Sequence, residues 1–203
     1  MADSAFSENM FPRFDEKSLA KPRMDGFSDP TMNDFLLLDF SAMFKPEFKE
    51  DRFEKEFIRS FLVAAQAVVE RGYRDTVRPN AYLFLDRSYV IPALYLVRHC
   101  MELSLKRAIR IKGGDPKNTH GLERLWSSFL QLIPKSSRGN SSKAISNMGK
   151  FVKFVSEFDG TGVDLRYPKS TDGSFTQDRA MWVNIREIVS LLEKFIEQLD
   201  KLE

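Results

Sequence analysis

The chain has 203 residues, of which 42% are hydrophobic and 30% are charged, so it can build a hydrophobic core and is not a wholly disordered protein. Its 31 Lys and Arg residues are almost balanced by 29 Asp and Glu residues. The resulting net charge of +2 excludes a strong overall attraction to nucleic acid or to a membrane. The single cysteine, Cys100, excludes a disulfide framework and a cysteine-rich zinc site.

The sequence carries no signal of export or of membrane insertion. The N-terminus lacks the basic region and the long apolar region of a signal peptide. The longest uncharged apolar run, residues 88–97, is about half as long as the roughly 20 residues of a membrane-spanning helix. We therefore expect a cytoplasmic protein with no membrane partner.

Residues 1–33 differ in composition from the rest of the chain. They contain three prolines and four scattered phenylalanines: Pro12, Pro22, Pro30, Phe6, Phe11, Phe14 and Phe27. Proline at this density prevents long helices. We expect an irregular arm over residues 1–33, which docks on its own domain or on a partner copy, and a single helical-bundle domain over residues 34–203.

In that domain, apolar residues recur at the three- and four-residue spacing of buried helix faces. The predicted helices cover residues 50–71, 89–112, 119–133, 141–158 and 178–202. Gly72 is expected to stop the first helix and Thr119 to cap the third. Alternating apolar residues at 163, 165 and 167, followed by Asp172-Gly173, predict a small β-hairpin before the last helix. The predicted fold class is all-α, a bundle of about five helices.

Short motifs of common enzymes are absent from the sequence. It contains no Gly-rich phosphate loop, no Gly-x-Ser-x-Gly, no His-Glu-x-x-His and no EF-hand loop. The two histidines, His99 and His120, would need carboxylates to complete a metal site. We therefore expect no metal and no cofactor.

A polar stripe marks the helix predicted over residues 89–112. Arg98, Glu102 and Lys106 are four residues apart, so they share one helix face. A solvated charged face is one interpretation. Because the helix is otherwise strongly apolar, we expect a partly buried stripe in which Glu102 bonds Arg98, Lys106 or Arg166.

The segment Pro92-Ala-Leu-Tyr-Leu-Val-Arg-His-Cys-Met-Glu-Leu-Ser-Leu-Lys106 resembles a helix of HEPN-like domains, in which an Arg-polar pair is followed by Glu and Lys. His120-Gly-Leu and Leu165-Arg-Tyr-Pro168 are similar to two further segments of the same superfamily. The resemblance implies a helical bundle that often forms a homodimer. Many members of this superfamily are metal-independent ribonucleases of toxin–antitoxin or antiviral defence systems, so the resemblance also implies such an activity.

The ribonuclease signature of these domains is an Arg followed, after four to six residues, by a His. After Arg98 the corresponding positions hold Leu103, Ser104 and Leu105, and no other Arg precedes a His at this spacing. The missing His favours a module that binds RNA, a nucleotide or a protein partner such as an antitoxin, without efficient catalysis. A ribonuclease effector and a purely structural helical adaptor are the alternatives.

If the chain cleaves RNA, a group that titrates near neutral pH must move a proton and a cation must stabilise the charge on the phosphate. The candidate catalytic residues are Arg98 as the cation, Glu102, and His99 or His120 as the proton carrier. His120 follows a short loop, so we expect it closer to the end of the preceding helix than to Arg98. A packing role for His99 and a capping role for His120 are the alternatives.

A basic stretch supplies candidate binding residues. Residues 135–153 contain five cations and no carboxylate. Lys106, Arg107, Arg110 and Lys112 near the end of the helix predicted over residues 89–112 add four more cations. The candidate binding residues are Lys106, Arg110, Lys143, Lys150, Arg166 and Tyr167. They are expected to contact RNA or a nucleotide. A solvated basic face, or a surface for an acidic protein, is the alternative.

Overall fold

The computed structural model describes residues 50–76, 87–116, 118–134, 142–160, 162, 164–167, 173 and 183–201. All of them belong to one compact unit, Pro46–Glu203. The expected arm over residues 1–33 lies outside the described residues. Its docking and the domain boundary after residue 33 therefore stay predictions.

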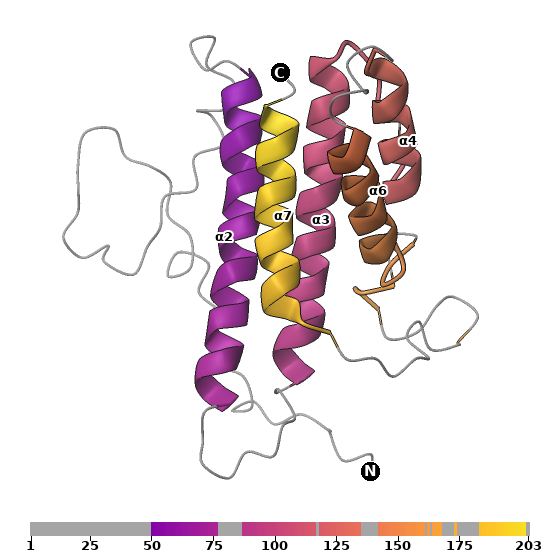
Figure 1. Ribbon diagram of the computed structural model, residues 1–203. Helices are drawn as coiled ribbons and strands as arrows, with labels where there is room; N and C mark the ends of the chain where they lie inside the picture. Colours follow the sequence, from indigo (N-terminus) through magenta and orange to yellow (C-terminus); the bar gives the residue numbers. More distant parts are fainter. Residues whose placement is uncertain are drawn as a thin grey trace, which may run out of the picture. The chain divides into compact units, whose positions relative to one another are not determined.

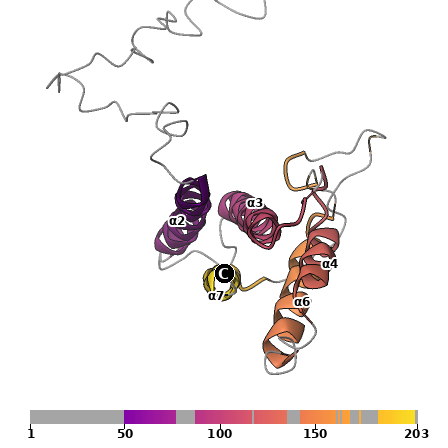
Figure 2. The same cartoon turned by 90° about the horizontal axis from the view of Figure 1, so that it is seen from above.

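The predicted all-α bundle of about five helices is confirmed over the described residues. The helices are α2 (Glu50–Thr76), α3 (Arg87–Ile111), α4 (Leu122–Leu132), α6 (Ser142–Ser156) and α7 (Ile185–Asp200). Helices α2, α3 and α7 run side by side (Figure 1). Helices α4 and α6 form a pair on the other side of α3 from α2 (Figure 2). Helix α3 contacts each of the other four and is the centre of the bundle.

The core forms around the apolar side of α3. Val97, Met101 and Leu105 follow one another along this side and are wholly buried. Fully buried side chains of the other helices meet them: Ala65, Leu122, Leu125, Val152 and Leu192. None of the helices in the described part is long and apolar enough to cross a membrane.

The first helix is longer than predicted, because Gly72 does not stop it. Helix α2 continues to Thr76, and Gly72 lies buried within it against Tyr89 at the start of α3. A Cβ atom at Gly72 would lie 3.1 Å from the Cβ atom of Tyr89. The glycine therefore allows α2 and α3 to approach each other closely, and the stop predicted there is wrong.

Two further predictions of local structure are wrong. Helix α4 begins at Leu122, and Thr119 does not cap it, because its hydroxyl accepts a hydrogen bond from the backbone N–H of Gly121 (3.3 Å) instead. The first arm of the expected hairpin is not a strand over its described part, since residues 164–166 form a turn. Residues 178–182, which were predicted to begin the last helix, lie outside the described residues.

Candidate functional site

A group of charged side chains lies at the middle of α3, where the start of α4 and the end of α6 meet it. We call it the Arg98 cluster, and its members are Arg98, Glu102, Lys106, His120 and Asp159. Arg98 is 2% exposed, and Glu102 and Asp159 are also buried. The prediction that the stripe is partly buried, with Glu102 bonded to its neighbours, is confirmed.

Arg98 joins three segments that are distant in sequence. Its Nη1 donates to Oε2 of Glu102 (2.6 Å), and its Nε donates to the backbone carbonyl of Asp159 (3.1 Å). Its Nη2 donates to the backbone carbonyl of His120. Each of the three guanidinium nitrogens is therefore bonded to the protein itself, and the buried side chain holds α3, the start of α4 and the end of α6 together.

Glu102 accepts hydrogen bonds from three directions. Besides Arg98, Lys106 donates from Nζ to Oε1 (2.7 Å), and Nδ1 of His120 lies 2.8 Å from the same oxygen. Burial alone raises the pKa of this carboxyl. The hydrogen bonds to Lys106, Arg98 and His120 outweigh that effect and lower the pKa to about 2. Glu102 is therefore a fixed negative charge at neutral pH.

Asp159 folds the segment that follows α6. Its Oδ1 accepts from the backbone N–H groups of Gly162 (2.6 Å) and Asp164 (3.1 Å). Because these groups are bonded to a carboxylate, they do not pair with a neighbouring strand, which explains the turn where a hairpin was expected. Gly162 has a φ of +85°, and a Cβ atom there would lie 2.8 Å from Nη2 of Arg98. The turn therefore fits tightly against the guanidinium group.

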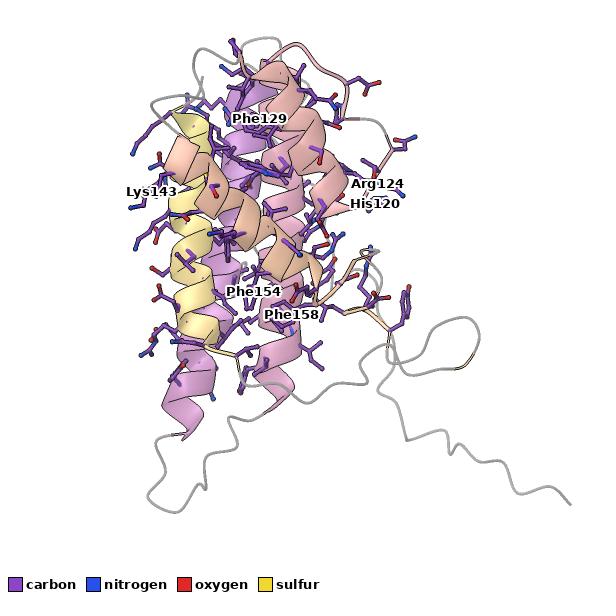
Figure 3. All side chains as sticks on the ribbon, turned by 45° about the vertical axis from the view of Figure 1, so that its right-hand side comes forward. His120, Arg124, Phe129, Lys143, Phe154 and Phe158 are labelled. Carbon is purple, nitrogen blue, oxygen red and sulfur yellow. The ribbon has the colours of Figure 1, made fainter. Side chains whose placement is uncertain are left out.

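His120 lies at the surface of the cluster. Its side chain is 59% exposed, while its Nδ1 contacts the buried Glu102. We expected His120 to lie close to the end of α3 and not close to Arg98. This expectation is wrong, because the backbone carbonyl of His120 accepts a hydrogen bond from Arg98. Arg124, one turn further along α4, is exposed, and its stem passes close to Gly121, so His120 and Arg124 lie at the same edge of the molecule (Figure 3).

The structure places His99 apart from this edge, in a row of aromatic rings. It packs edge-on against Phe61 (ring centroids 4.6 Å apart) and stacks on Tyr95 (5.9 Å), and Phe57 and Phe53 continue the row along α2. Burial lowers the pKa of His99, and the charges of Arg98, Arg166 and Lys106 act in the same direction, opposed by Glu102. These contacts support a packing role for His99.

The structure does not bring the other candidate binding residues into one patch. Lys106 belongs to the Arg98 cluster, whereas Arg110 pairs with Glu54 of α2. Arg166 donates from Nε to the carbonyl of Gly162 (2.8 Å) and lies over the ring of Tyr95. Tyr167 is exposed on the same turn.

Lys143 and Lys150 lie two turns apart on the exposed face of α6. Asn147 and Phe154 occupy the same face, since all four positions are separated by three or four residues, and all four are exposed. We call this set of Lys143, Asn147, Lys150 and Phe154 the α6 stripe. Figure 3 shows α6 with Lys143 at its beginning and Phe154 towards its end. Helix α6 contains no carboxylate.

A separate cavity of about 370 Å³ lies between α2, α3 and α7. Its walls include Arg59, Ser104, Arg107 and Glu197, and Arg107 donates to Asp200 (2.8 Å) beside it. None of the candidate residues predicted from the sequence lines this cavity. Among the described residues, no group of three or more His, Cys, Asp or Glu side chains is placed to hold a metal ion.

Sequence reasoning missed Asp159 and Arg124. An Asp at the end of a predicted helix, followed by two glycines at 160 and 162, is a signal for a side-chain-stabilised turn. No local signal indicates that this turn lies against Arg98, which is 61 residues away. Arg124 gives no signal in the sequence, because one exposed cation on an amphipathic helix is ordinary.

Comparison with known proteins identifies the family. The model of the HEPN domain matches residues 78–202, which is more than half of the chain and includes α3, α4, α6 and α7. No curated protein and no solved structure gives a significant match. The match to the family model agrees with the helical bundle and with the resemblance carried by the α3 segment, and the chain therefore belongs to the HEPN domain family.

Proposed function

We propose that this HEPN domain binds RNA through the α6 stripe and that the Arg98 cluster is a structural centre, not an efficient catalytic one. The observation that carries the proposal is an exposed helix face with two lysines and an aromatic ring on a helix without any carboxylate. Lysines bind phosphates, and aromatic rings stack on bases. Because the net charge is only +2, the chain as a whole attracts RNA weakly, and a local basic patch must supply the binding.

The state of Arg98 supports the second part of the proposal. A cation that stabilises a phosphate must reach the surface, whereas Arg98 is buried and donates to Glu102 and to two backbone carbonyls. In addition, the chain has no His at the spacing that HEPN ribonucleases use. The Arg and the His of that signature are therefore not both present at a surface where they could act on RNA.

Charge reversal on α6 tests RNA binding. We expect the double variant Lys143→Glu/Lys150→Glu to weaken RNA binding, measured by fluorescence anisotropy between 50 and 200 mM salt. The slope of log affinity against log salt should fall by about 2, since each lost phosphate contact removes about one unit.

The matched control is Arg52→Glu/Arg59→Glu on α2, the helix on the other side of α3. These two exposed residues have the same seven-residue spacing, and the variant has the same change in net charge. It should bind RNA almost as the wild type does. Equal losses in both double variants, or no RNA binding by the wild type, would contradict the proposal and would leave an acidic protein or a nucleotide as the ligand to test.

One observation favours a second function, metal-independent RNA cleavage. Glu102 holds the ring of His120 through Nδ1, while the side chain is 59% exposed, and a carboxylate that orients an exposed imidazole is an arrangement suited to proton transfer. Lys106 contacts the same carboxylate oxygen, and Arg124 provides an exposed cation at the same edge.

This second function predicts cleavage that persists in EDTA and leaves a 2′,3′-cyclic phosphate. His120→Ala should then lower the rate by at least about 10²-fold, the scale of general acid–base catalysis. The control is His99→Ala, which removes the other histidine and should leave the rate nearly unchanged. RNA that stays intact with the wild-type protein would exclude this function and leave the binding proposal in place.

We also propose that the chain forms a homodimer. Dimers are frequent among HEPN domains, and Phe57, which is 42% exposed, continues a row of rings along α2 with Phe53 and Phe61, so that the aromatic side chains are contiguous. A measurement of the mass of the chain in solution tests this proposal.

A further inference from the structure

Phe154 stands out on the α6 stripe. Its ring is 40% exposed, although it follows Lys150 by one helical turn on a basic face. The ring is not loose, because it packs edge-on against the buried Phe158, with centroids 5.1 Å apart and planes at 88°. The protein therefore holds an aromatic ring in place while leaving part of it in contact with solvent.

The position of this ring at the end of the stripe defines a short path on the surface. Lys143 and Phe154 are 11 residues apart, which corresponds to about 16 Å along a helix. Beyond Phe154, the next side chain on this face is the carboxylate of Glu157, so the basic path ends at the ring. Lys153, three residues after Lys150, is also exposed, so the order along α6 is three cations, which suit a phosphate backbone, and then one ring, which suits a base.

We propose that the RNA bound on α6 is single-stranded where it crosses the stripe, with one unpaired base stacked on the ring of Phe154. This inference rests on the proposed RNA binding. In a duplex, neighbouring base pairs cover both faces of each base, so a helix face can contact phosphates, 2′-hydroxyls and base edges but cannot stack a ring on a base within the duplex. The lysines alone would serve a duplex equally well, whereas an anchored, exposed ring contributes only if a base is free to cover it.

The experiment compares a labelled 12-nucleotide single-stranded RNA with the blunt duplex of the same sequence, by anisotropy at one salt concentration. We expect the wild type to prefer the single strand. Phe154→Ala should weaken binding of the single strand by roughly 5- to 150-fold, the range measured for loss of one base–aromatic stack, and should leave duplex binding unchanged.

Three further variants separate stacking from other effects. Phe154→Tyr keeps the ring and should retain the preference, while Phe154→Leu keeps an apolar side chain without a ring and should lose it. Ile91→Ala, which shortens an exposed apolar side chain of α3 outside the stripe, should have no effect. Thermal melting of each variant checks that Phe158 stays packed and that the fold is intact.

The outcomes distinguish this inference from the function on which it rests. If single strand and duplex bind equally, and Phe154→Ala matches the wild type while the double lysine variant is weakened, RNA binding stands and the stacking inference is overturned. If neither RNA binds, the proposed function itself fails. A duplex preferred over the single strand would overturn the inference directly.

Discussion

At the scale of single residues, burial determines what Arg98 can do. Removing a guanidinium from water costs several kcal/mol unless protein acceptors replace the water, and Arg98 has acceptors on each of its three nitrogens. The same bonds direct all three nitrogens of the guanidinium towards protein acceptors, which supports the proposal that Arg98 does not serve a ligand. We therefore propose that Arg98 is a positioning residue, because its bonds to the carbonyls of His120 and Asp159 hold both residues against α3.

Glu102 is the residue on which the cluster depends most. Glu102→Ala would remove the closer of the two carboxylates paired with the buried Arg98 and the acceptor at its Nη1, leaving Asp159 (Nε–Oδ2 3.5 Å). We therefore expect the free energy of unfolding to fall by about 3–5 kcal/mol. Urea denaturation measures this change. The control variant Glu54→Ala breaks the more exposed ion pair with Arg110 and should lower the free energy of unfolding by less than about 1 kcal/mol. Equal losses in the two variants would show that the Arg98 cluster contributes no more than a surface ion pair.

The acid stability of the protein should depend on the same carboxyl. The pKa of Glu102 is lowered from 4.5 to about 2 in the folded chain, so the unfolded state binds more protons between these values. The stabilisation is therefore complete above about pH 4.5 and is lost as the pH falls towards 2. The shift corresponds to a contribution on the order of 3 kcal/mol.

Glu102→Gln provides the control for this pH dependence, because glutamine has the shape of the protonated acid but does not titrate. Urea unfolding of both proteins from pH 6 to pH 2.5 should show a difference in stability that narrows steadily below pH 4.5. Curves that stay parallel over this range would mean that Glu102 titrates normally in the folded protein.

At the scale of elements, the turn after α6 depends on close contact with α3. Gly162→Ala would strain a backbone with a φ of +85° and would also push a Cβ atom into the guanidinium of Arg98. Gly113, at the end of α3, has a similar φ of +76° but no neighbouring atom within 4 Å of a Cβ. We expect Gly113→Ala to lower the free energy of unfolding by about 1–2 kcal/mol, and Gly162→Ala to lower it clearly more. Calorimetry of the two variants measures the difference, and equal losses would show that Arg98 moves aside without resistance.

The elements of the bundle were largely predictable from the sequence, because apolar periodicity determines which residues are helical and which side is buried. Both α3 and α6 follow their predicted bounds within two residues. The shared face of Arg98, Glu102 and Lys106 was predictable from their spacing for the same reason. The family resemblance is carried by the residues of the segment Pro92–Lys106 themselves.

The contacts between elements were not predictable in this way. Gly72 has the properties of a helix stop in the sequence, and only the neighbouring Tyr89 shows why a glycine is needed inside the helix. Leu165 and Tyr167 alternate as in a strand, but the carboxylate of Asp159 takes the backbone N–H groups that a strand would pair. The contact of His120 with Glu102 likewise depends on how the loop before α4 returns along α3.

At the scale of the whole molecule, α3 separates two surfaces with different chemistry. One side carries the Arg98 cluster, the exposed His120 and the α6 stripe, whose exposed side chains are polar or basic apart from the ring of Phe154. The other side carries α2, where the rings of Phe53, Phe57 and Phe61 follow one another. This division leaves the basic side free for RNA if two copies associate through α2.

We expect the chain to be a dimer and Phe57 to contribute to its interface. Light scattering at tens of micromolar should give twice the chain mass of 23.5 kDa, or 47 kDa. Phe57→Glu should give the monomer mass, because burying an unpaired carboxylate in an apolar interface costs several kcal/mol. Val63→Glu is the control, since Val63 is an exposed apolar residue of the same helix that borders the cavity towards α7. The Val63→Glu variant should remain a dimer. A wild-type mass of 23.5 kDa would rule out the dimer, and a dimer that survives Phe57→Glu would place the interface elsewhere on the molecule.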